Sequence, residues 1–128
     1  MNIEVEVSFG EFLDKLTILQ IKSERIKDPA KLANINKERD LLQQTWDNNP
    51  KSKVDLTTEL HQLKSINEKL WNIEDDIRDK ERNKNFDQGF IELARSVYFS
   101  NDERARIKRV INEKLGSNLV EEKSYSDY

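Results

Sequence analysis

Apolar residues recur at intervals of three and four along most of the chain, which is the period of an amphipathic α-helix. The pattern predicts five helices, at about residues 9–27, 29–47, 56–82, 88–100 and 103–115. Ser8 with Glu11 three residues later forms a capping box before the first helix. Asp28 followed by Pro29 is a strong start signal for the second helix. We therefore expect an all-α fold, a single helical-bundle domain over residues 1–128.

The two ends of the chain depart from this pattern. Apolar and polar residues alternate over residues 3–7, as in a half-buried β-strand. A lone strand needs a partner, and the best candidate is segment 118–123 of the polar tail over 117–128, which contains the apolar pair Leu119 and Val120. We expect a short N-terminal strand that pairs with this tail.

The helix predicted over residues 56–82 is the expected spine of the fold. Its inner face keeps an alternating four-three spacing, which is the heptad register of a coiled-coil-like helix. The positions are Leu56, Leu60, Leu63, Asn67, Leu70, Glu74, Ile77 and Glu81. At about 1.5 Å per residue, a helix of this length spans roughly 40 Å.

The composition favours thin apolar stripes over a thick core. Charged residues make up 37% of the chain and hydrophobic residues 35%, whereas shares of about 25% and 45–50% are usual. The net charge is only −3 and the apolar residues are periodic, and both facts argue against disorder. A second chain could complete the burial of these stripes. We expect a homo-oligomer, most simply a two-fold dimer along the 56–82 helix, and allow for another protein partner.

Residue types exclude several classes of chemistry. The chain has no cysteine, so it has no disulfide, thiolate nucleophile or cysteine metal site. Its three glycines, Gly10, Gly89 and Gly116, lie too far apart for a phosphate-binding loop. His61 is the single histidine, which is too few for a typical zinc site. We expect neither a metal nor a cofactor.

Charge and hydropathy bear on location and partners. The first seven residues lack the basic and apolar regions of a signal peptide, and no apolar run approaches the roughly 18 residues of a membrane span. We expect a cytoplasmic protein that does not bind membranes. The most basic stretch, over residues 103–115, contains acidic residues and no interleaved aromatic residue, so we do not expect nucleic-acid binding.

Two acidic motifs have the spacing of motifs in pyrophosphate-processing enzymes. Asp75, Asp76 and Asp79 match the DDxxD pattern of isoprenoid synthases. Glu11 and Asp14 match the ExxD pattern of helical nucleotide pyrophosphatases. Both enzyme classes need a second acidic motif that this chain lacks. We interpret the first motif as a solvated helix face and Glu11 as a capping residue.

A polar row on the central helix is the candidate functional site. Asn67 and Glu74 occupy core positions of the heptad, Trp71 lies between them, and Arg78 lies one turn beyond Glu74. A buried polar group without a hydrogen bond costs roughly 1–3 kcal/mol, so the row needs partners. The candidate partners are Arg95 and Tyr98 on the 88–100 helix, Asn101 directly after it, and Asp14 and Lys15 on the first helix.

Two hypotheses account for this row. One is a small pocket for an anionic ligand related to a sugar or a nucleotide, used by a binding protein or an enzyme. Its candidate residues are Asn67, Trp71, Glu74, Arg78, Arg95 and Tyr98. The other, which we favour, is a structural network or dimer seam that fixes helix register. We therefore expect a non-catalytic helical interaction or assembly module.

Five blocks of the sequence carry a resemblance to a known family. They are residues 3–8, 10–19, 67–78, 92–102 and 119–125. Through them the chain resembles an uncharacterised family of small helical proteins from bacteria and their phages, one of the numbered domains of unknown function. The resemblance implies a complete domain without an assigned activity. It also draws attention to the polar row, which lies inside these blocks.

Overall fold

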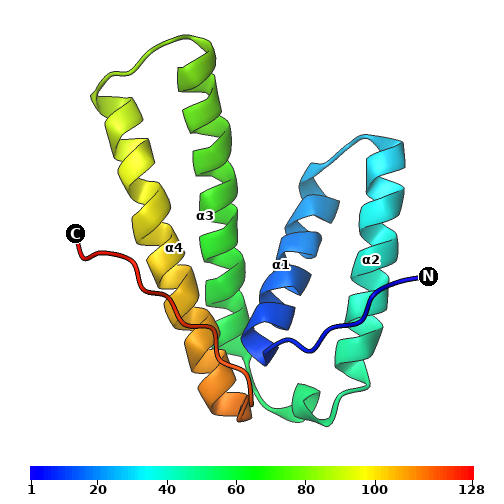
Figure 1. Cartoon of the computed structure of the whole chain (residues 1–128). Helices are drawn as coiled ribbons and strands as arrows, with labels where there is room; N and C mark the ends of the chain where they lie inside the picture. The colour runs from blue at the N-terminus through cyan, green and yellow to red at the C-terminus, as the bar shows by residue number, and fades with distance from the viewer.

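The computed structural model describes residues 1–128 and contains α-helices, one 3₁₀ turn and no β-strand. The elements are α1 (Phe9–Arg25), α2 (Pro29–Asp47), η1 (Pro50–Lys53), α3 (Thr57–Arg82) and α4 (Gln88–Leu115). The helices form two hairpins, α1–α2 and α3–α4, which meet at one end and diverge toward the other (Figure 1). The all-α expectation is confirmed.

Side-chain caps begin three of the helices. Ser8, Asp28 and Asp87 each accept a hydrogen bond from the backbone amide three residues ahead, at 2.9–3.1 Å. Gly116 follows α4 in the left-handed conformation, with φ of 66°, which ends the helix. Ser8 and Asp28 are the caps that the sequence indicates, because a cap depends on neighbours within one turn.

The last two predicted helices are a single helix, so the expected break near residue 101 is wrong. α4 continues through Asn101 and Asp102, whose side chains resemble a helix cap in the sequence. Ser100, Ile107 and Ile111 are all buried on one face of α4, so the stripe continues past these two residues. No glycine or proline interrupts the backbone there. Continuous packing therefore outweighs the local capping preference.

The expected N-terminal strand is also wrong. Residues 1–7 have no regular secondary structure, and Ile3, Val5 and Val7 are exposed. The C-terminal tail does not pair with them, because it follows α4 while the N-terminal segment runs toward α2 (Figure 1). Alternation of apolar residues makes a strand only where another backbone supplies hydrogen bonds.

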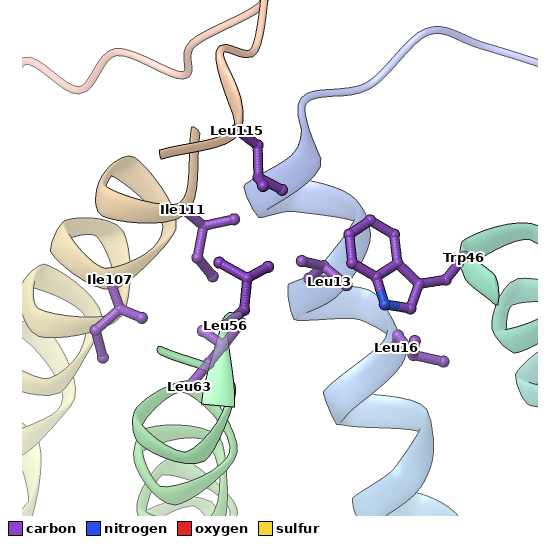
Figure 2. Packing of buried hydrophobic residues seen from close by; sticks show 8 residues of the cluster. All are labelled: Leu13, Leu16, Trp46, Leu56, Leu63, Ile107, Ile111 and Leu115. Atoms are coloured by element: carbon purple, nitrogen blue, oxygen red, sulfur yellow. The ribbon is translucent and has the colours of Figure 1, made fainter. Parts of the chain in front are cut away.

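The hydrophobic core lies where the two hairpins meet. Its buried cluster consists of Leu13, Leu16, Trp46, Leu56, Leu63, Ile107, Ile111 and Leu115 (Figure 2). Trp46 is the buried residue of α2, and the rings of Phe9 and Phe12 lie 6.4 Å from its ring. Each such side chain contributes about 1.5–3 kcal/mol on burial, so this cluster is what joins the hairpins.

The α3–α4 hairpin extends beyond α1. At the last residue of α1, the Arg25 guanidinium donates to Asn72 Oδ1 at 2.7 Å, and α3 continues for several more turns. We call the part beyond this point, residues 73–95, the outer hairpin. No helix of the chain is long and apolar enough to cross a bilayer.

Candidate functional site

Asn67 lies buried between α3 and α1. The residue is 6% exposed, and its amide donates to Asp14 Oδ1 at 2.9 Å and to Thr17 Oγ1 at 3.1 Å. The Thr17 hydroxyl in turn donates to the backbone carbonyl of Asp14 at 2.8 Å. The expectation of a buried, hydrogen-bonded amide is confirmed. Of the candidate partners on the first helix and on the 88–100 helix, Asp14 of α1 is the one that bonds to Asn67.

Asp14 is the centre of a charged network. It is 1% exposed, and both its carboxylate oxygens accept hydrogen bonds from the Arg104 guanidinium, one of them from Nε at 2.9 Å. The ammonium of Lys108 lies 3.9 Å from the same carboxylate. The hydrogen bonds to Asp14 raise the pKa of Arg104 above its usual value. A bidentate pair of this kind fixes orientation as well as charge.

Lys108 links this network to the surface. Its Nζ donates to Glu11 at 2.7 Å and to Glu121 of the C-terminal tail at 3.0 Å. Burial lowers the pKa of Lys108, but the hydrogen bonds to Glu11 and Glu121 outweigh that effect, and the net shift is upward. The ammonium therefore stays charged. We call Glu11, Asp14, Thr17, Asn67, Arg104 and Lys108 the polar cluster.

The backbones of α1 and α4 touch beside the polar cluster. The Gly10 amide donates to Asn112 Oδ1 at 2.7 Å. A Cβ atom at Gly10 would lie 2.5 Å from the Lys108 carbonyl oxygen and 3.0 Å from Asn112 Oδ1. Only glycine allows this approach, which sets the distance between the first turn of α1 and α4.

The remaining α3 residues of the predicted row lie on the surface or at its edge. Glu74 and Arg78 are exposed and form an ion pair with each other, with Nε and Oε2 at 3.0 Å. Trp71 is half-buried, and the Arg25 guanidinium lies 5.8 Å from the centre of its ring. These three side chains do not join the polar cluster.

The two α4 residues of the predicted row are exposed. The Arg95 guanidinium lies 5.8 Å from the Phe99 ring. The ring of Tyr98 lies 4.9 Å from that of Phe99 and 5.2 Å from that of Tyr128. The structure therefore does not bring Arg95 and Tyr98 to Asn67. Their role in ligand binding stays a prediction.

Sequence reasoning missed the part of Arg104 and Lys108. Both stand in the basic stretch considered for nucleic acid, and a spacing of four residues places them on one face of α4. This spacing could have indicated two cations that pair with Asp14, which was already a candidate partner of Asn67. The sequence did not show that α1 packs against α4 where Asp14 meets Arg104 and Lys108.

A groove lies between α4 and the C-terminal tail, beside the polar cluster. Its volume is about 1200 Å³, and its lining includes Tyr98, Asp102, Arg104, Lys108, Tyr125 and Tyr128. Glu121 of the tail lies near this groove, and hydrogen bonds from Lys123 and Lys108 lower its pKa to about 2. The groove thus combines tyrosine rings with charged groups of both signs.

The arrangement of the polar cluster suits a structural role. Asp14 and Glu11 are bound by cations, and Asn67 is bound to α1. No group of three or more histidine, cysteine, aspartate or glutamate side chains is placed to hold a metal ion. The cluster holds α1 against α3 and α4.

Comparison with known proteins places the chain in a sequence family. The model of a family of unknown function, DUF6165, matches residues 3–128. No curated protein matches the chain, and no solved structure matches it. The family match confirms the resemblance to a domain of unknown function that the sequence blocks indicate.

Proposed function

We propose that this chain, which belongs to the DUF6165 family of unknown function, is a non-catalytic interaction module that pairs with a second copy through its outer hairpin. The uncovered apolar side chains of that hairpin are the observation that carries this proposal. Phe86 is 54% exposed and Ile91 is 48% exposed. α1 ends before this part of α3, so the outer hairpin is a layer of two helices without a third.

A second copy is the occupant that this surface fits best. The heptad register of α3 continues past the end of α1 through Ile77, which is half-buried within one chain. An antiparallel copy would complete a four-helix arrangement, in which each hairpin covers the other. In a two-fold pair the same patch serves both chains, so the hairpin has to be complementary to itself.

The charges of the outer hairpin satisfy this requirement. Acidic residues occupy 74–76 at the start of its α3 segment, and the basic residues Lys80, Arg82 and Lys84 stand at the end, where each also pairs with a carboxylate of its own chain. Antiparallel pairing brings the acidic start of one copy near the basic end of the other. Such complementarity favours the antiparallel register over the parallel one.

Light scattering on a sizing column tests this proposal. We expect the chain to elute with twice the mass of one copy. The variants Phe86→Glu and Ile91→Glu should shift it to a single copy, with helical content unchanged by circular dichroism, because both side chains are exposed within one chain. Leu41→Glu is the matched control, since Leu41 is 55% exposed on α2, and it should keep the larger mass.

Two outcomes would contradict the proposal. One is a single-copy mass for the unmodified chain at every concentration tested. The other is a doubled mass that survives both outer-hairpin substitutions but disappears with Leu41→Glu, which would move the interface to α2.

The alternative of a ligand-binding protein or an enzyme has less support. It requires Glu74, Arg78 and Arg95 to face one ligand together with Asn67. Within one chain Glu74 and Arg78 neutralise each other, and Asn67 is engaged by α1. Because Glu74 and Arg78 are exposed and paired with each other, they do not form a pocket with Asn67.

A further inference from the structure

The C-terminal tail, residues 117–128, folds back along α4 (Figure 1). An acidic pair holds its first half. Glu121 accepts a hydrogen bond from Lys108 Nζ at 3.0 Å, and Glu122 accepts two from the Arg109 guanidinium at 3.2 and 3.3 Å. This part of α4 therefore binds two neighbouring carboxylates with two cations that are consecutive in sequence.

An aromatic contact holds the other end of the tail. The Tyr128 ring lies 5.2 Å from the Tyr98 ring and 4.8 Å from the Phe99 ring. Its hydroxyl donates to the Asp102 carboxylate. The tail thus touches α4 with an acidic pair and, six residues after Glu122, with an aromatic ring.

The tail fills this face only in part. A groove of about 1200 Å³ remains between α4 and tail residues 123–128. No residue from 118 to 128 makes a hydrogen bond between backbone groups, and all of them are exposed. A segment held by exposed side chains alone opens at low cost in free energy.

We propose that this face of α4 is a docking site for an extended acidic segment of a partner protein, and that the tail occupies the site when the partner is absent. The partner segment would carry two adjacent carboxylates for Lys108 and Arg109 and a later aromatic ring for Tyr98 and Phe99. A bulkier side chain than that of Ser126, which lines the groove, would fill more of it. The proposal is independent of pairing through the outer hairpin, because different residues carry it.

Charge favours a peptide over a polyphosphate chain. Arg104 also lines the groove, but both carboxylate oxygens of the buried Asp14 bind it. Asp102 lines the same groove and repels further negative charge. Two carboxylates are enough to pair with Lys108 and Arg109, whereas a polyphosphate chain such as a nucleic-acid backbone carries a negative charge on every unit.

Peptide binding to the full-length chain tests the proposal. The probe is a fluorescently labelled peptide with the sequence of residues 117–128, followed by anisotropy. The intact chain should bind it weakly, because its own tail competes at high effective concentration. A chain with Glu121→Gln, Glu122→Gln and Tyr128→Ala has a weakened tail and should bind the probe roughly tenfold more tightly.

Further variants identify the site. Adding Arg109→Glu to the weakened-tail chain should raise the dissociation constant at least about tenfold, because it reverses the charge opposite the acidic pair. Lys37→Glu, an exposed basic residue on α2, is the matched control and should leave binding unchanged. A probe with Ser126→Phe should bind more tightly than the tail sequence, by roughly tenfold, since the new ring enters the groove that Ser126 lines.

Three results would overturn the proposal. These are no binding of the probe to the weakened-tail chain, equal loss of binding with Arg109→Glu and Lys37→Glu, and no gain from the phenylalanine at position 126. Circular dichroism on each variant shows that the helices are intact. The labelled probe reports this site irrespective of whether the outer hairpin pairs two chains.

Discussion

Asp14 is the residue at which three helices are tied together. It belongs to α1, accepts from Asn67 of α3 and pairs with Arg104 of α4. A buried ion pair adds little when compared with apolar packing, but removal of one partner leaves the other charge buried and unpaired. The loss of stability on removing Asp14 therefore comes mainly from Asn67 and Arg104, which lose their partner.

Asp14→Asn should destabilise the chain by about 1–3 kcal/mol, because the Arg104 guanidinium, which is 29% exposed, then loses its counter-charge. Urea unfolding followed by circular dichroism measures this as a fall in the midpoint. Lys15→Ala is the control on the neighbouring residue. Lys15 makes an exposed ion pair with Glu38, so its loss should change the free energy of unfolding by less than about 0.5 kcal/mol. Similar losses in both variants would contradict a special role for Asp14.

At the scale of the elements, the crossing of α1 and α4 depends on Gly10. The first turn of α1 lies directly on the backbone of α4, and the Gly10 amide bonds to Asn112. The core cluster lies next to this contact, since Leu13 is one turn further along α1. A change in the spacing here disturbs the packing of both hairpins.

Gly10→Ala should destabilise the chain by about 1–3 kcal/mol, because the new methyl group meets the Lys108 carbonyl, a backbone atom that cannot move aside. Gly89→Ala is the matched control near the start of α4. There the nearest atom is the flexible end of Lys80, and alanine favours helix, so we expect a change between zero and about 1 kcal/mol of stabilisation. Thermal unfolding of both variants measures the two changes in stability. If Gly10→Ala stabilised the chain, the close contact between α1 and α4 would not be required for packing.

Sequence patterns predicted elements better than their junctions. The positions of α2 and of the long α3 follow from periodicity and capping, which act within a few residues. The continuity of α4 through Asn101 did not follow, because Asn and Asp favour a cap only when packing does not demand a helix. For the candidate site, the burial of Asn67 was predictable from its heptad position, while its link to Arg104 through Asp14 was not.

At the scale of the whole molecule, one main apolar cluster joins two diverging hairpins, and side-chain contacts alone hold tail residues 118–128 on α4. The core cluster draws residues from both hairpins at the end where they meet (Figure 2). Farther along, Glu24 and Arg25 at the end of α1 still pair with α3, and beyond them the outer hairpin is held only within itself. The outer hairpin and the tail are therefore the parts most available to other molecules.

Acid should release the tail from α4. Glu121 has its pKa lowered to about 2 from 4.5, first by Lys123 and then by Lys108. A lowered pKa means that its contribution is fully present above pH 4.5 and is lost as the pH falls through about 2. The side chain is 42% exposed, so solvent screening reduces the free energy involved. NMR shifts of residues 121–128 should change over this range.

Glu121→Gln is the control for this titration. Its tail shifts should lack the component that titrates near pH 2. A Glu121 signal that titrates near 4.5, its ordinary pKa, would contradict the hydrogen bonds from Lys123 and Lys108.

The sequence by itself determined which side of each helix is apolar and where most helices begin and end, because both depend on residues within one or two turns. Only the tertiary structure decided what covers each side. Asn67 and Glu74 occupy the same heptad face of α3, yet one is buried and the other exposed. The reason is that α1 ends at Arg25, beside Asn72. The length of a neighbouring helix, rather than the register of α3, decides which polar residue is enclosed.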